Sequence, residues 1–91
     1  MRTSIKTLEY LVERINTETG SPLKPWERVN DRNVAQIGNF HLSQAYGGVC
    51  VHRMSNESGG VTTPIVHGHI PKAELESKLR AFLAGLEFKK D

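Results

Sequence analysis

The side chains best able to do chemistry are concentrated in residues 39–56, NFHLSQAYGGVCVHRMSN. This stretch holds two of the four histidines, the only cysteine, a tyrosine and an arginine. Imidazole and thiolate are preferred ligands of Zn²⁺, and a cysteine beside a histidine can act as an activated nucleophile. The stretch therefore raises two chemical hypotheses, a metal centre and a catalytic pair, and both depend on spacing.

The spacing of these residues argues against both hypotheses. Cys50 has no second cysteine, and the chain lacks the short, regularly spaced ligand pairs of zinc sites. His52 is two residues from Cys50, so on a strand the two side chains lie side by side rather than converging. The chain also has no phosphate-loop motif, dinucleotide fingerprint or G-x-S-x-G turn. We predict a protein that is not an enzyme and uses no cofactor or metal; a zinc site is the weaker alternative.

The same part of the chain offers groups that suit a small anionic ligand such as a nucleotide. The glycine pairs at 47–48 and 59–60 can bring backbone N–H groups close to an anion. Arg53 offers a planar fork for a phosphate or carboxylate, unless it pairs with a nearby carboxylate of the chain. Trp26 can stack on a ring, unless it packs its loop onto the core. The predicted ligand-binding residues are His41, Tyr46, His52, Arg53 and Trp26.

Two amphipathic helices are expected to frame these groups. Residues 4–18 repeat apolar side chains every three or four positions, with Ser4 or Thr3 as a cap and Gly20 as a stop. A second helix starts at about Pro71. The apolar stripes are Ile5, Leu8, Leu11, Val12 and Ile15 in the first helix, and Leu75, Leu79, Phe82, Leu83 and Leu86 in the second.

Between the helices the pattern changes to short β-strands. Residues 20–33 are predicted to be irregular because two prolines interrupt them, and the polar residues 55–64 are predicted to be an exposed loop. Gly38-Asn39 and Gly47-Gly48 suit two-residue hairpin turns. They divide the region into antiparallel strands at about 34–37, 40–46 and 49–54. The alternative is one bulged strand over 34–46 that pairs with the last strand as a hairpin.

A turn at Gly47-Gly48 sets the register of the last two strands. It places His41 opposite Met54, with His41 and His52 as diagonal neighbours about 7–8 Å apart. Alternation sends one set of side chains to the core and the other to the opposite face. The predicted core face carries Phe40, Leu42, Tyr46, Val49 and Val51, and the opposite face carries His41, Ser43, Ala45, Cys50, His52 and Met54.

The chain as a whole reads as one small α+β domain over residues 1–91. We expect an N-terminal helix, an antiparallel β-meander or hairpin, and a C-terminal helix packed on one face of the sheet. The other face stays free for solvent, a ligand or a second subunit, and a core this small favours a homo-oligomer. The net charge is +2 with no basic run, which argues against nucleic acid; no apolar segment can span a membrane, so we expect a cytoplasmic protein.

The ordered motifs IGNFHL, AYGGVCVHRM, ESGGV and GHIPK resemble a group of small bacteriophage and prophage proteins over about residues 5–86. The group brings no established activity with it. The resemblance implies action in an infected bacterial cell by stoichiometric binding. One expected function is capture of a small anionic ligand, such as a signalling nucleotide, to counter host defence. The alternative is a protein that docks on a host enzyme and inhibits it; nucleic-acid binding is a weaker option.

Overall fold

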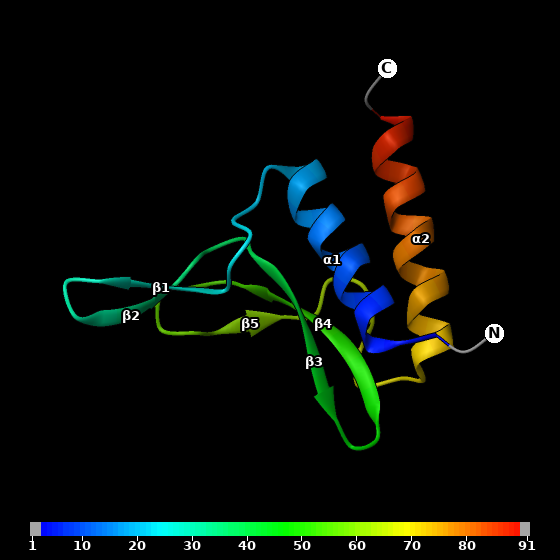
Figure 1. Cartoon of the computed structure of the whole chain (residues 1–91), viewed down its shortest axis with the longest axis horizontal. Helices are drawn as coiled ribbons and strands as arrows, with labels where there is room; N and C mark the ends of the chain where they lie inside the picture. Colours follow the sequence, from blue (N-terminus) through cyan, green and yellow to red (C-terminus); the bar gives the residue numbers. More distant parts are fainter. Residues whose placement is uncertain (1–2, 90–91) are drawn as a thin grey trace.

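One helix precedes and one follows two small antiparallel sheets in the chain, which confirms the predicted α+β class (Figure 1). The computed structural model describes residues 3–89. The elements in chain order are α1 (Ile5–Thr19), β1 (Trp26–Val29), β2 (Arg32–Ala35), β3 (Phe40–Ala45), β4 (Gly48–Met54), β5 (Val61–Thr62) and α2 (Lys72–Phe88).

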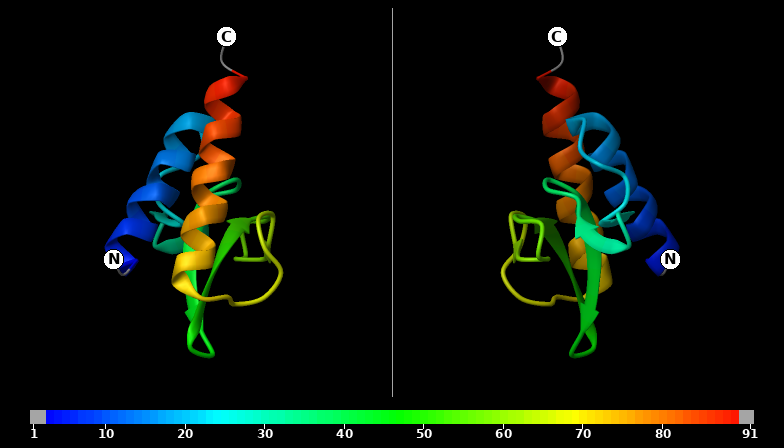
Figure 2. Two further views of the ribbon diagram at one scale, coloured as in Figure 1. Left: turned by 90° about the vertical axis from the view of Figure 1, so that its right-hand side faces the viewer. Right: turned by 90° about the vertical axis from the view of Figure 1, so that its left-hand side faces the viewer.

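The helices form where the apolar stripes predict them. Ser4 caps α1, because its Oγ accepts the Thr7 N–H at 3.1 Å, and Gly20 ends the helix in the left-handed conformation. Pro71 caps α2, so this helix begins one residue after the predicted start. The two helices run side by side, and an exposed ion pair at 2.7 Å joins Arg14 to Glu87 (Figure 2). The apolar stripes meet over the sheet; their fully buried members are Leu8, Leu11, Val12, Ile15, Leu75, Leu79 and Leu83.

The main sheet has the order β3-β4-β5, and its first turn differs from the prediction by one residue. Ala45 pairs with Gly48, so the turn is Tyr46-Gly47, and both residues have positive φ, 55° and 74°. A Cβ on Gly48 would lie 3.0 Å from the His69 and Ile70 backbone. The glycine is therefore needed for close passage of another segment, while Tyr46 takes the turn position.

The corrected turn shifts each pair by two residues and keeps the side chains within β3 and β4 on their predicted faces. His41 lies opposite His52 instead of Met54. Phe40, Val49 and Val51 are buried among the helices, as predicted. Tyr46 was predicted to be in the core; it is 98% exposed, because a turn residue no longer follows the alternation of the strand.

The face turned away from α1 is partly covered by a chain segment, residues 63–70. In both views of Figure 2 this segment lies on the opposite side of the β3–β4 hairpin from α1. Its Val66 packs near Cys50, which is fully buried although it lies on the same face of the sheet as His41 and His52. Ile70 pairs with Val49 through two backbone hydrogen bonds of 2.8 and 2.9 Å, which ties the segment to β4.

Residues 20–37 correct the prediction most. β1 and β2 form a hairpin over part of the segment that we expected to be irregular. The predicted strand 34–37 corresponds in part to β2, which pairs with the preceding β1 and not with the strand that follows it. The alternative of one continuous strand over 34–46 is also wrong. Asn30 and Asp31 make the turn at φ 49° and 63°, which short polar side chains tolerate. The third strand of the main sheet is β5, within the exposed segment 55–64.

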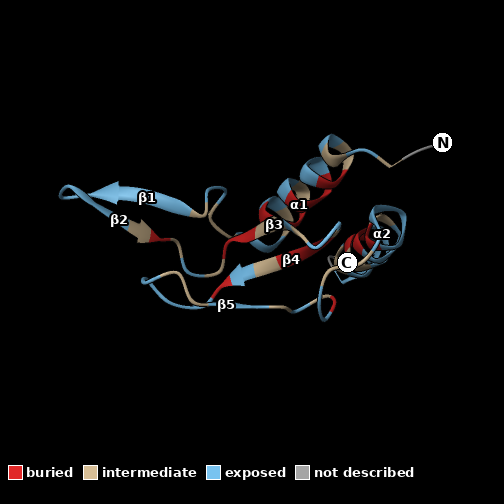
Figure 3. Cartoon of the chain, turned by 90° about the horizontal axis from the view of Figure 1, so that it is seen from below, coloured by how far each residue is buried: buried red, intermediate tan, exposed pale blue. Residues whose placement is uncertain are grey.

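The β1–β2 hairpin projects from the body as an arm (Figures 1 and 3). Most of its residues are exposed, and Ala35 is the buried one. The arm is anchored at its base, where the Ala35 N–H donates to the Glu57 carbonyl at 3.1 Å and the Gln36 N–H donates to the Pro25 carbonyl at 2.8 Å. The arm is therefore attached to the body at one end and exposed to solvent along most of its length.

Candidate ligand-binding face of the sheet

A row of four rings lies on the β3–β4 surface that faces away from α1. We call this row the histidine face; it consists of Tyr46, His69, His52 and His41. The ring centroids of His41 and His52 are 5.6 Å apart, those of His52 and His69 6.3 Å, and those of His69 and Tyr46 5.8 Å. Each pair meets edge to face, an arrangement that aromatic rings favour.

Two elements bring these rings together. His41 and His52 are direct cross-strand neighbours on β3 and β4, closer than the diagonal relation that we predicted. His69 arrives from residues 63–70, and its Nε2 lies 3.1 Å from Ser43 Oγ. Sequence reasoning did not select His69, since its approach depends on close packing of two segments at Gly48. The spacing His67-Gly68-His69 was the one available signal, and the structure leaves His67 exposed and outside the row.

Burial and close spacing favour the neutral forms of His41 and His52. Burial lowers the pKa of His41, and the neighbouring His52 lowers it further. Burial likewise lowers the pKa of His52, with a further contribution from His69. Protonation of one imidazole therefore opposes protonation of the next, unless an anion lies between them.

A buried amide defines the tautomer of His41. Asn39 is fully buried, and its Nδ2 donates to the Pro22 carbonyl at 2.7 Å. Asn39 Oδ1, which can only accept, is 3.2 Å from His41 Nδ1. His41 Nδ1 must then carry the proton, and Nε2 presents a lone pair. An anion can receive a hydrogen bond from Nε2 only after His41 takes up a second proton.

Arg53 and Trp26 lie apart from the histidine face. Arg53 belongs to the helix side of β4, where its guanidinium is 4.8 Å from the Phe40 ring centroid and its Nε donates to the Gly38 carbonyl at 3.2 Å. Trp26 lies in β1 against Gly59, where a Cβ would be 2.7 Å from the indole ring. Half-exposed Trp26 thus packs the 59–60 loop against the arm. Of the predicted site, the structure brings together His41, His52 and Tyr46.

Cys50 takes no part in this surface. It is fully buried, and burial raises the pKa of its thiol, which keeps it protonated. Within residues 3–89, no three His, Cys, Asp or Glu side chains are placed to hold a metal ion together. The ring nitrogens and ring faces of the row can take part in hydrogen bonding and stacking.

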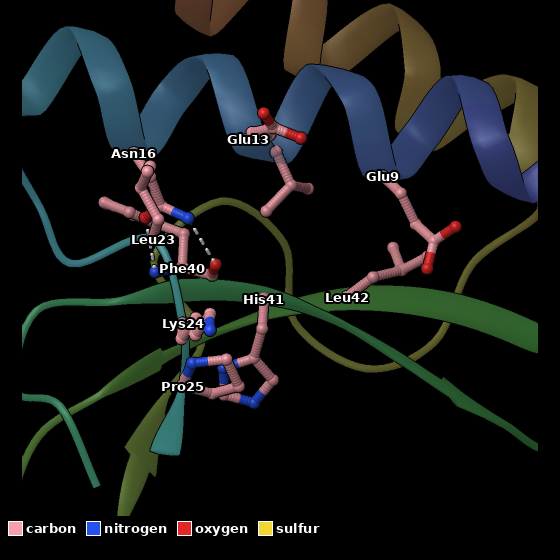
Figure 4. A pocket seen from close by; sticks show the side chains of 10 residues that line it. Glu9, Glu13, Asn16, Leu23, Lys24, Pro25, Phe40, His41 and Leu42 are labelled. Atoms are coloured by element: carbon pink, nitrogen blue, oxygen red, sulfur yellow. Dashed lines mark hydrogen bonds between the residues drawn. The ribbon is translucent and has the colours of Figure 1, made fainter. Parts of the chain in front are cut away.

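An open cleft of about 410 Å³ lies next to the histidine face, between α1, residues 23–25 and β3 (Figure 4). His41 is the residue that the two share. α1 forms one wall and β3 the other, with Leu23, Lys24 and Pro25 at one end. The side chains that line the cleft are those of Glu9, Val12, Glu13, Asn16, Leu23, Lys24, Pro25, Phe40, His41 and Leu42.

Comparison of the chain with protein-family models, with curated proteins and with solved structures gives no match. The resemblance to phage proteins therefore stays a prediction. Neither α1 nor α2 has the length and apolar character needed to cross a bilayer.

Proposed function

We propose that the protein binds a small anionic ligand stoichiometrically on the histidine face and performs no catalysis. The observation that supports this proposal is the continuous row of Tyr46, His69, His52 and His41. Three adjacent imidazoles on a half-exposed surface present several ring nitrogens to one ligand, and protonation turns each acceptor nitrogen into an N–H donor.

The chemistry favours a nucleotide-like molecule. A base can stack on Tyr46, which is almost fully exposed at the turn, while a phosphate reaches the imidazoles further along the strands. The negative charge of the phosphate raises the pKa of His41 and His52, so each binding event takes up protons. The positive charge that holds the phosphate therefore forms on the histidines as the ligand binds.

The biological setting of the proposal comes from the phage resemblance. We propose that the protein captures a signalling nucleotide in the cytoplasm of an infected bacterium and thereby counters host defence. Assembly into a homo-oligomer would place several histidine faces in one particle and increase the amount of ligand that each particle holds.

The test is a thermal-shift and calorimetry panel of cyclic and linear nucleotides at pH 6 and pH 8. At one hundred times the dissociation constant, binding should add about 2.7 kcal/mol to the free energy of unfolding. Binding should be tighter at pH 6, and His52→Gln should weaken it, while the matched control His67→Gln should not. If no nucleotide changes the melting curve at either pH, the proposal is wrong.

Docking on a host enzyme is the second candidate, and the arm favours it. A two-stranded hairpin is only marginally stable in water, yet β1–β2 exposes Val29 and Trp26 by 44% each. A partner that covers the arm would bury these side chains. The test compares the wild-type chain with Val29→Ser as bait in a bacterial lysate, with Phe88→Ser as the exposed apolar control. A protein retained by the wild type and the control but lost with Val29→Ser supports docking through the arm; equal retention contradicts it.

A further inference from the structure

The outer edge of β3 carries backbone groups that the main sheet does not use. β3 is the first strand of the order β3-β4-β5, so β4 covers one of its edges only. Val49 directs its N–H and C=O to Ile70, away from β3, which makes Gln44–Val49 a pair without mutual hydrogen bonds. By alternation, the N–H and C=O groups of Phe40, Leu42 and Gln44 all point to the outer edge.

The first of these three residues is already satisfied by a side chain. Asn16 of α1 is fully buried; its Nδ2 donates to the Phe40 carbonyl at 2.9 Å, and its Oδ1 accepts the Phe40 N–H at 2.8 Å (Figure 4). One amide side chain thus makes the same two hydrogen bonds that a neighbouring strand would make. The edge groups of Leu42 and Gln44 differ from those of Phe40. No residue between 3 and 89 forms a hydrogen bond with them.

The cleft beside this edge has an apolar floor and an acidic rim. Val12, Leu42 and Phe40 contribute apolar surface, and Glu9 and Glu13 line the α1 side. Among residues 3–89, neither Glu9 nor Glu13 belongs to an ion pair. Lys24 lies at the other end of the cleft, and the nearby His41 has a lowered pKa, so carboxylates dominate beside β3.

We propose that the β3 edge and this cleft bind an extended peptide segment of a partner protein in which a basic and an apolar residue lie two positions apart, so that both point to the same side of the added strand. The peptide adds a strand to β3 through the N–H and C=O groups of Leu42 and Gln44. Its apolar side chain enters the cleft, and its lysine or arginine approaches Glu9 and Glu13. A second copy of this chain fits less well, because a two-fold β3 contact would bring the acidic sides of two α1 helices together.

The experiment measures the fluorescence anisotropy of a labelled peptide with the repeat lysine–threonine–valine–threonine, which places lysine and valine on one side of the strand, with the full chain. Saturable binding is expected, with protection of the Leu42 and Gln44 amides from hydrogen exchange. N-methylation of alternate peptide bonds should weaken binding at least about tenfold, because it removes the donors that a strand needs. A peptide with glutamate in place of lysine should bind at least about tenfold more weakly.

Two variants locate the peptide on the chain. Gln44→Pro removes an outward N–H that β4 does not use, so the sheet stays paired while affinity falls about tenfold or more. Glu9→Gln combined with Glu13→Gln should weaken binding about threefold to tenfold at low salt. The matched control, Glu74→Gln with Asp31→Asn, removes two exposed carboxylates elsewhere and should leave affinity unchanged.

Three results would overturn the proposal. The first is no saturable binding of the lysine–valine peptide, and the second is equal binding of its N-methylated form. The third is a dimer of the chain, seen by native mass spectrometry, that protects the Leu42 amide without peptide and resists peptide addition; it would assign the edge to a second copy. None of these results bears on nucleotide binding at the histidine face, which the His52→Gln variant tests separately.

Discussion

At the scale of single residues, two buried asparagines organise the surroundings of β3. Asn16 satisfies the N–H and C=O of Phe40, and Asn39 satisfies the Pro22 carbonyl while it orients His41. Both side chains are at least 98% buried, so each lost hydrogen bond would leave a polar group without water. The candidate binding surfaces therefore depend on two amides whose hydrogen bonds are made within the chain.

Asn16→Leu keeps the number and branching of the side-chain heavy atoms and removes both bonds to Phe40. The Phe40 N–H and C=O would then be buried without partners, and we expect a loss of about 2–4 kcal/mol in the free energy of unfolding. The measurement is urea denaturation beside the control Thr17→Ala, whose exposed hydroxyl bonds only to Glu13 of the same helix. A midpoint for Asn16→Leu equal to that of the control would contradict the role assigned to the amide.

The histidine face should make stability depend on pH. The folded pKa values of His41 and His52 lie below their ordinary value of 6.5, so the unfolded chain binds more protons between the two. The contribution of the neutral histidines is present above pH 6.5 and is lost as pH falls through the folded pKa values. The melting temperature should therefore be lower at pH 5 than at pH 8. His41→Gln with His52→Gln should reduce this difference, whereas His67→Gln should preserve it; a wild-type chain that melts higher at pH 5 would refute the sign.

At the scale of elements, the crossing of the 63–70 segment over the start of β4 governs the site. Gly48 permits this crossing, because the His69 and Ile70 backbone lies where a Cβ would be. The crossing delivers His69 to Ser43 and Tyr46 and secures Ile70 against Val49. Displacement of this one segment would separate His69 from the other rings.

Gly48→Ala tests the crossing. The added methyl group meets backbone at 3.0 Å, which cannot rotate away, so we expect a loss of about 1–3 kcal/mol. Gly85→Ala is the matched substitution, since its Cβ would meet open space in the last turn of α2, and it should stabilise the helix by up to about 1 kcal/mol. Both are measured by chemical denaturation. Effects of opposite sign are expected, and a neutral Gly48→Ala would show that the segment does not pack as described.

The elements also separate what the sequence could predict from what it could not. Both helices follow from their apolar stripes, and the division of β3 and β4 into two faces follows from alternation. The sequence did not predict the arm. Two prolines indicated an irregular segment over residues 20–33, and the hairpin turn at Asn30-Asp31 lies within that segment. A residue distant in sequence decided the rest: His69 joins the row through a contact with Ser43. Arg53 follows His52 on β4, so alternation alone places it on the helix side, where it stacks on Phe40.

At the scale of the whole molecule, the chain is flat, with extents of 44 × 39 × 21 Å. One part of it, the helices on the main sheet, contains nearly the whole buried core. The other part, the arm, contributes little buried area and is joined to the body at its base (Figure 3). Stability should therefore be distributed unevenly between the two parts.

Hydrogen exchange should reveal this difference. Amides in 26–35 open locally and should exchange well before amides in 40–54, which open only when the core unfolds. The measurement is exchange with mass spectrometry on the isolated chain, and the fully buried Ala35 should be the slowest amide of the arm. Similar protection in both segments would show that the arm is covered, as by another copy in solution.

The Asn16 amide also limits the length of any strand that joins the sheet. Because Asn16 already occupies both edge groups of Phe40, an incoming strand cannot slide past Leu42 in that direction. The turn at Tyr46-Gly47 ends the edge in the other direction. Between these two barriers only Leu42 and Gln44 remain, so the edge reads a short motif in a single register. A designed peptide would gain nothing from greater length and much from rigidity.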